Sequence, residues 1–171
     1  EDIVRALPKD ISDQQKTYAA YLQAKVYAGQ GKKIRAREIW ENVVKMNTDR
    51  ETRAKSSYAI INQDLEAKTI TPADAAIKMD KLLVVWKGDK FEYDLLEKLG
   101  SIYEADGQYL KALRIYKQMV TKFPDYPGTE QTGEKMKKVF IGALSSSPDD
   151  RAKIFDDLAT YSEFKELIPV G

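Results

Sequence analysis

The sequence predicts an all-α protein, an α-solenoid of antiparallel helix pairs with about three repeats and additional C-terminal helices. Apolar residues recur at helical spacing over most of the chain. A pattern of small and aromatic residues returns with a period of about 38 residues, as expected for stacked helical repeats. Glycines, prolines and capping residues lie between the periodic stretches, where helices start and stop. We expect helices at 13–29, 32–46, 50–67, 72–86, 90–106, 109–122 and 129–144, and a further helix from Pro148.

Composition excludes several classes of protein. The 171 residues carry 28 Lys and Arg against 27 Asp and Glu, so a net charge of +1 supplies no bulk positive field for nucleic acid. The chain contains no Cys and no His, which removes disulfides, Cys or His zinc sites, a thiol nucleophile and a histidine base. No apolar run of about 18 residues is present to cross a bilayer. We therefore expect no catalytic residue, no metal, no cofactor, no nucleic-acid partner and no membrane insertion.

Residues 1–12 are expected to be the end of a preceding element. Ile3, Val4 and Leu7 form a short apolar set that stops at Pro8, whose ring cannot continue a helix. Because the chain begins without Met, we expect it to be a piece of a longer protein.

The first repeat is expected at residues 17–50. Gly31 marks the turn between its two helices, because glycine adopts a positive φ without a Cβ clash. Small Ala36 and large Trp40 lie four residues apart on one face of the second helix. A small residue lets two helices approach closely, and a large one fills the space beside it.

The second repeat, at residues 51–88, is expected to be degenerate, because its turn lacks a glycine. Its second helix nevertheless has a clear start, with Thr71 as the N-cap and Pro72 at the first helical position. The run 82–86 is apolar on all sides, which predicts burial from two directions.

The third repeat, at residues 93–126, has the most complete pattern. Its signature residues are Leu99, Gly100, Tyr103, Gly107, Tyr109, Ala112, Tyr116 and Pro124. Leu-Gly-x-x-Tyr, followed by Ala-x-x-x-aromatic and a closing proline over about 34 residues, resembles the tetratricopeptide repeat (TPR). The resemblance implies a right-handed superhelix that binds a protein or peptide, with the first helix of each repeat lining a concave groove.

Placing the chain on the TPR register yields a candidate partner-binding groove. It comprises Tyr18, Tyr21, Lys25, Lys55, Asn62, Gln63, Asp94, Glu97, Ser101 and Glu104. The carboxylates among them would repel the acidic tails that some TPR proteins clamp, so we expect a partner of mixed charge. Tyr18 and Tyr21 also allow a second interpretation, packing against whatever precedes residue 10, because aromatic stripes on helices are mostly core.

Residues 127–171 are expected to form additional packing helices. Ser147 is placed to cap the helix that starts at Pro148. The chain stops at Gly171 without the polar capping helix that solenoids need, so we expect it to continue or to be covered by a partner.

Two segments carry a narrower resemblance. Trp-Lys-Gly-Asp at residues 86–89 and the stretch 161–169 resemble a family of long bacterial TPR proteins that are exported. The resemblance implies an internal or C-terminal piece of an extracytoplasmic scaffold, in an envelope or motility-related assembly. A periplasmic location is expected on this basis, and a cytoplasmic one stays open.

We expect the chain to be a non-enzymatic scaffold that holds a protein partner. Two alternatives stay open: a structural spacer with no ligand of its own, and a helical arm of an envelope enzyme whose active site lies elsewhere. The carboxylates of 94–104 are interpreted as a solvated helix face rather than an acid–base pair. The stretch 29–33 lacks the spacing of a phosphate-binding loop. The oligomeric state stays open.

Overall fold

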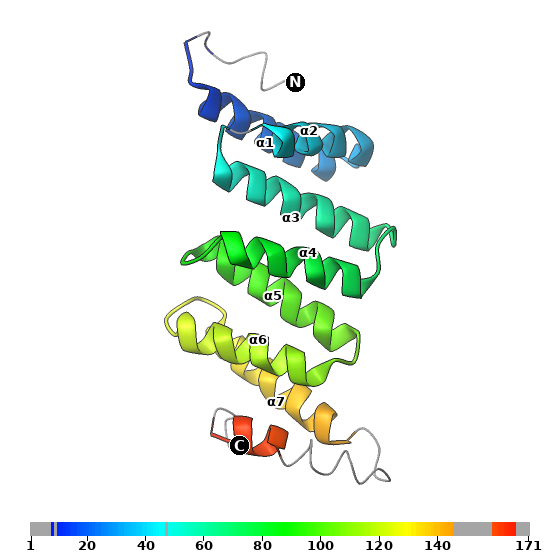
Figure 1. Ribbon diagram of the computed structural model, residues 1–171, viewed down its shortest axis with the longest axis vertical. Coiled ribbons are helices and arrows are strands. Elements are labelled where there is room, and N and C mark those ends of the chain that lie inside the picture. The colour runs from blue at the N-terminus through cyan, green and yellow to red at the C-terminus, as the bar shows by residue number, and fades with distance from the viewer. Residues whose placement is uncertain (1–7, 9, 47, 146–158, 167–171) are drawn as a thin grey trace. The chain divides into compact units, whose positions relative to one another are not determined.

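The computed structural model describes residues 8, 10–46, 48–145 and 159–166. These residues contain helices and connecting turns but no strand. The helices are α1 (Asp13–Gly29), α2 (Lys33–Lys45), α3 (Arg50–Glu66), α4 (Pro72–Val85), α5 (Lys90–Ala105), α6 (Tyr109–Lys122) and α7 (Thr129–Ser145), and 159–164 adds a short helical segment (Figure 1). The all-α prediction is confirmed, and the seven longer helices differ from their expected bounds by at most one residue at either end. The expected element before Pro8 and the start of the expected helix at Pro148 lie outside the described residues.

The chain divides into two compact units, Glu1–Lys87 and Gly88–Gly171. In the first unit, α1 packs on α2, α2 on α3 and α3 on α4. In the second unit, α5 packs on α6 and α6 packs on α7. Within each unit, helices that follow one another along the chain therefore pair side by side in antiparallel fashion, as predicted (Figure 1).

The turns of the first and third repeats have the same geometry. Gly31 and Gly107 have φ of +78° and +72°, the left-handed region in which glycine avoids a steric penalty. The amide after each glycine donates to the carbonyl of Tyr27 or Tyr103, at 2.9 and 2.8 Å. These bonds close a Schellman motif, which satisfies carbonyls at the end of the first helix and starts the second.

The degenerate second repeat has the same turn without the glycine. Lys68 takes the glycine's place at φ 57°, and the amide of Thr69 donates to the carbonyl of Asp64 at 2.9 Å. The following helix starts later than in the other repeats, at Pro72, where the Thr71 hydroxyl accepts the N3 amide at 3.1 Å. α4 therefore begins four residues after its turn residue, whereas α2 and α6 begin two residues after Gly31 and Gly107.

The cores of the hairpins confirm the pairing of small and large residues. In the first hairpin, Ala24, Tyr27, Ala36 and Trp40 form a buried cluster. In the third, the fully buried ring of Tyr116 lies directly against the backbone of α5. The close approach of two antiparallel helices therefore depends on small side chains at these positions.

One expectation for α4 is wrong. The residues of α4 that are buried lie on one face of the helix: Ala75, Ala76, Met79 and Leu83. Val84 and Val85 are 78% and 44% exposed, so the apolar run at 82–86 is not buried from two directions. A run of consecutive apolar residues covers every side of a helix, whereas the packing of the first unit covers only one.

Candidate functional site

The predicted groove residues fall into two groups. Tyr18, Tyr21 and Lys25 lie on α1, and Lys55, Asn62 and Gln63 lie on α3, all in the first unit. Asp94, Glu97, Ser101 and Glu104 lie on α5 in the second unit.

We define the α1–α3 face as Tyr18, Tyr21 and Lys25 of α1 together with Lys55 and Tyr58 of α3, two residues near enough to Tyr21 to influence its ionisation. The rings of Tyr18 and Tyr21 have centroids 6.2 Å apart and are tilted by 31°. The ammonium of Lys25 lies 5.8 Å from the centroid of the Tyr21 ring, within the range of a cation–π contact. Tyr18 is 47% exposed, whereas Tyr21 is partly buried and packs against the core of the first hairpin. The face therefore presents an aromatic surface in which the Tyr21 ring is fixed by the core of the first hairpin and the Tyr18 ring is exposed.

The ionisable groups of the α1–α3 face influence one another. Burial raises the pKa of the Tyr21 phenol; the charge of Lys55 opposes this, and nearby Tyr18 and Glu51 add to the rise. Burial alone would lower the pKa of Lys55, but its hydrogen bond to Glu51 and the charge of that carboxylate raise it. At neutral pH the face thus holds the neutral phenol of Tyr21 beside the charged ammonium of Lys55.

Sequence reasoning missed two members of this neighbourhood, Glu51 and Tyr58. Both are close enough to Tyr21 to act on its ionisation. Their positions relative to Lys55, four residues before and three after, place all three on one face of α3. That helical spacing was the signal that would have found them.

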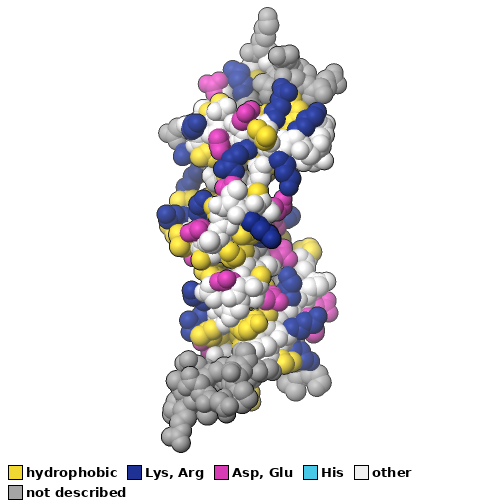
Figure 2. All heavy atoms as spheres, turned by 90° about the vertical axis from the view of Figure 1, so that its right-hand side faces the viewer, with side chains coloured by type: hydrophobic (Ala, Val, Ile, Leu, Met, Phe, Trp, Pro, Cys, Tyr) yellow, Lys and Arg dark blue, Asp and Glu magenta, His cyan; other side chains and the backbone are white. Residues whose placement is uncertain are grey.

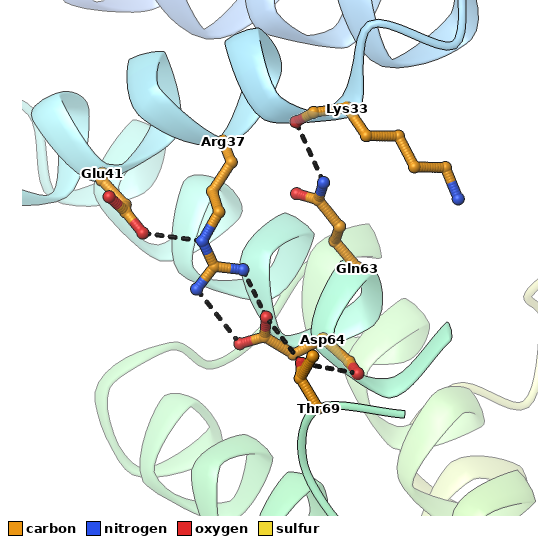
Figure 3. Close-up of polar contacts among 6 residues, drawn as sticks. All are labelled: Lys33, Arg37, Glu41, Gln63, Asp64 and Thr69. Atoms are coloured by element: carbon orange, nitrogen blue, oxygen red, sulfur yellow. Dashed lines mark hydrogen bonds and ion pairs between the residues drawn. The ribbon is translucent and has the colours of Figure 1, made fainter. Parts of the chain in front are cut away.

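Gln63 belongs to a different part of the first unit. Its Nε2 donates to the backbone carbonyl of Lys33 at 2.9 Å, which ties α3 to the start of α2 (Figure 3). The side-chain oxygens of Asn62 and Gln63 are buried and accept no hydrogen bond from the described residues. Gln63 is therefore a residue of the α2–α3 junction, whereas Asn62 lies on the same face of α3 as Lys55.

A polar cluster fills the junction between α2 and α3 (Figure 3). Arg37 donates to Glu41 at 2.8 Å and, through its two terminal nitrogens, to the Asp64 carboxylate. Thr69 donates through its hydroxyl to the same carboxylate at 3.2 Å. Burial alone would raise the pKa of Asp64, but the hydrogen bond and charge of Arg37 outweigh burial and lower it. A carboxylate satisfied in this way joins two repeats rather than serving as a base.

The carboxylates of α5 have partners within the second unit. Lys90 donates to both oxygens of Asp94 at 2.8 and 2.9 Å, and Lys135 of α7 lies 4.0 Å from Glu97. Figure 2 shows acidic and basic side chains interspersed over the face that it presents. The sequence suggested that the α5 carboxylates would repel an acidic partner. Ion pairs of this kind weaken that repulsion.

Glu104 and Ser101 are directed toward α6. The Tyr116 hydroxyl donates to Glu104 at 2.8 Å, and Ser101 is a second hydrogen-bond neighbour of the same phenol. Burial first and Glu104 second raise the pKa of Tyr116 well above its ordinary value. Both predicted groove residues therefore help to hold the buried ring of their own hairpin.

The described residues show neither an arrangement typical of a metal centre nor one typical of a membrane span. These residues include no cluster of three or more acidic, His or Cys side chains arranged to bind a metal ion. None of the described helices combines the length and the apolar character needed to cross a membrane.

Comparison with known proteins supports the fold. No family model matches the chain, and no curated protein matches it. A crystal structure from Podosopora anserina, described as a kinesin light chain with nearly identical TPR-like repeats, superimposes with a TM-score of 0.59. It shares 14% sequence identity, over 95% of this chain and 84% of that one. The chain thus has a TPR-like helical repeat structure.

Proposed function

We propose that the chain is a non-enzymatic module that binds a protein or peptide partner through the α1–α3 face. The observation that carries the proposal is the exposed ring of Tyr18, tilted beside the ring of Tyr21, over which the ammonium of Lys25 lies. Tyrosine is enriched at the centres of protein interfaces, because its large ring contributes contact area and its hydroxyl contributes a hydrogen bond.

The α1–α3 face is suited to binding because its rings are already positioned. Tyr21 packs against Ala24, Tyr27, Ala36 and Trp40, so its ring does not have to be ordered when a partner arrives. Tyrosine also has few rotatable bonds, which lowers the entropy lost on binding. The Tyr21 ring is thus fixed in position, and the neighbouring Tyr18 ring is exposed for contact with a partner.

Binding without catalysis fits the chemistry of this face. Lys55 is held by Glu51, and the phenol of Tyr21 has a raised pKa, so neither group is set to act as a base near neutral pH. The proposal therefore assigns contact and charge to these side chains, and no proton transfer.

The test is a peptide-display selection on the full chain, followed by affinity measurements on two variants. Tyr18→Ala removes the exposed ring, and Tyr161→Ala is a matched control, because Tyr161 is 52% exposed and lies in the second unit. We expect the selected peptides to lose affinity for the first variant only. A selection that enriches no peptide would instead favour a structural spacer, and peptides indifferent to Tyr18→Ala would refute the α1–α3 face as the binding surface.

The partner of mixed charge predicted from the sequence is tested by a third variant. Charge reversal at Asp94 and Glu97 changes α5 without altering the α1–α3 face. If the partner also contacts the second unit, this variant binds more weakly while the packing of α1 and α3 is unchanged.

We further propose that the protein works in an extracytoplasmic bacterial assembly of the envelope or of motility. This proposal is supported by the resemblance of residues 86–89 and 161–169 to exported TPR proteins. Fractionation of cells that express the full-length protein tests it. Recovery in the periplasm supports it, and recovery in the cytoplasm alone refutes it.

A further inference from the structure

We infer that the first unit has a second docking surface, the groove between α1 and α2, and that its ligand is an amphipathic helix of a partner protein with acidic residues at one end. The inference goes beyond the proposed function, because the groove and the α1–α3 face lie on different sides of α1. Residues 20, 23 and 27 line the groove, whereas residues 18, 21 and 25 belong to the α1–α3 face. At 3.6 residues per turn, these two sets point in nearly opposite directions from the helix axis.

Two adjoining hollows form the groove. One has a volume of about 320 Å³ and lies between the two helices, and the other, of about 710 Å³, opens at the turn that joins them. Arg35 and Glu38 line both hollows, so the groove is continuous. From Arg35 to Met46 it follows α2 for about three turns, or about 16 Å. Its apolar lining residues are Ala20, Tyr27, Ile39, Val43 and Met46.

The groove is on the side of the first hairpin that faces away from α3. On α2, Arg37 and the carbonyl of Val44 form hydrogen bonds with residues of α3. Arg35 and Asn42 lie on the other side of α2, and both are exposed. Met46, at the far end of the groove, is 43% exposed. A ligand can therefore reach the groove along its length without displacing α3.

The lining of the groove favours a helix over an extended segment. The backbone amides and carbonyls of α1 and α2 are bonded within their own helices, so they offer little to the backbone of a ligand. An extended segment would leave its own amides and carbonyls unsatisfied over apolar side chains, which is costly. A helix satisfies its backbone internally and can place an apolar stripe in the groove, with anchors at i, i+3, i+4 and i+7.

Two cations are held in position at the turn end of the groove. The Lys32 ammonium lies 5.5 Å from the centroid of the Tyr27 ring, and Cζ of the Arg35 guanidinium lies 4.8 Å from it. Tyr27 is 8% exposed, and its hydroxyl accepts a hydrogen bond from Gln23 at 3.0 Å, so the ring that supports both cations is fixed. Within the part of the chain that the structure describes, neither cation forms an ion pair.

These charges select where the ligand is acidic. Lys33, the third cation at this end, is already paired with Glu66 at 3.2 Å, which leaves Lys32 and Arg35 to bind carboxylates of the ligand. Glu38 is exposed one turn further along α2 and would repel an acidic residue there. Acidic residues are therefore favoured only at the end of the ligand that lies over the turn. Electrostatic complementarity of this kind sets specificity and the rate of association.

The experiment selects binders to the full chain from a displayed helical scaffold with randomised surface positions, and measures their affinities by fluorescence anisotropy. We expect the binders to share an apolar stripe that ends in Glu or Asp. Replacing both Lys32 and Arg35 with Gln should weaken them about tenfold and reduce the dependence of binding on salt. Replacing Lys78 and Lys81 with Gln is the matched control, because both are exposed lysines of α4 and the loss of charge is the same.

A second pair of variants tests the apolar part of the groove. Ala20→Glu places a charged side chain among the apolar lining residues and should abolish binding of the selected helices. Ala73→Glu adds the same charge at an exposed position of α4 and should leave their affinity unchanged.

The outcomes separate this inference from the proposed function. Helices that bind the Lys32 and Arg35 double variant as tightly as the unaltered chain would overturn the inference, as would a selection that enriches no helix. Helices that lose affinity for Tyr18→Ala but not for Ala20→Glu would overturn it and support the α1–α3 face. The opposite pattern supports the groove, whatever the α1–α3 face binds. The double variant alters only exposed side chains, so it keeps the test valid if Ala20→Glu proves poorly folded.

Discussion

Replacing Gly100 with alanine should destabilise the second unit, although alanine is the better helix former. Gly100 lies inside α5, and a Cβ there would overlap the ring of Tyr116, reaching Cδ1 at 2.9 Å and Cζ at 3.0 Å in addition to Cε1. The ring is fully buried and its hydroxyl is bound to Glu104 at 2.8 Å, so it cannot move aside freely. Overpacking of this kind costs about 1–3 kcal/mol, and we expect the upper part of that range.

Helix propensity works in the opposite direction. Glycine in the middle of a helix is about 1 kcal/mol less favourable than alanine. Subtracting this gain leaves a net loss of about 1–2 kcal/mol for Gly100→Ala. The matched control is Gly133→Ala in α7, where an added Cβ would meet no atom within 4 Å. That variant should gain about 1 kcal/mol, so the two substitutions should have opposite signs.

Thermal unfolding followed by circular dichroism measures both variants. A change of 1 kcal/mol shifts the Tm of a unit of this size by about 4–8 °C. If Gly100→Ala raises the Tm as Gly133→Ala does, the close approach of α5 and Tyr116 is wrong. A double variant adds a further check, because Gly100→Ala should cost less when leucine replaces Tyr116.

Three other predictions concern single contacts. Lys68→Gly should stabilise the first unit by about 1 kcal/mol, because glycine adopts the φ of 57° without strain; denaturant melts that show a loss would contradict this. The lowered pKa of Asp64 means that its stabilising effect is present above about pH 4 and is lost as pH falls through the folded value. Asp64→Asn should therefore flatten the acid limb of a stability–pH profile, and an unchanged profile would show that Arg37 does not hold this carboxylate. Lys122→Met should destabilise the second unit by about 3 kcal/mol, because it removes an ammonium that pairs with the fully buried Glu92 carboxylate; calorimetry showing no loss would refute the pairing.

The helices and their ends were predictable because they depend on neighbours in the sequence. Thr71 caps α4 through the N3 residue, and Gly31 and Gly107 take the positive φ that their turns require. Each of these interactions spans a few residues, so the sequence shows both partners at once.

The position of the turn in the second repeat was predictable from the sequence, but its backbone conformation and its side-chain partners were not. The period of the repeats pointed to the right segment, but Lys68 carries no signal for a left-handed conformation. Asp64 stands in the place of a tyrosine, and nothing in the neighbouring sequence points to its partner. Its partner Arg37 lies 27 residues earlier, and only the packing of α3 on α2 brings the two together.

The candidate site divides in the same way. Helical spacing placed Tyr18, Tyr21 and Lys25 on one face of α1, and the structure keeps them together. It could not show that Gln63 turns to the α2–α3 junction, or that Glu104 is engaged by a buried tyrosine.

By itself, then, the order of residues determined where each helix begins, where it ends and which stripe of it is apolar, since those properties arise within one or two helical turns. Tertiary packing decided which charged groups are buried away from solvent and which aromatic ring remains exposed to it. Glu92 is buried against Lys122, 30 residues away, whereas Tyr18 remains 47% exposed. Desolvation depends on every neighbour that closes around a side chain, and those neighbours come from helices distant in the sequence.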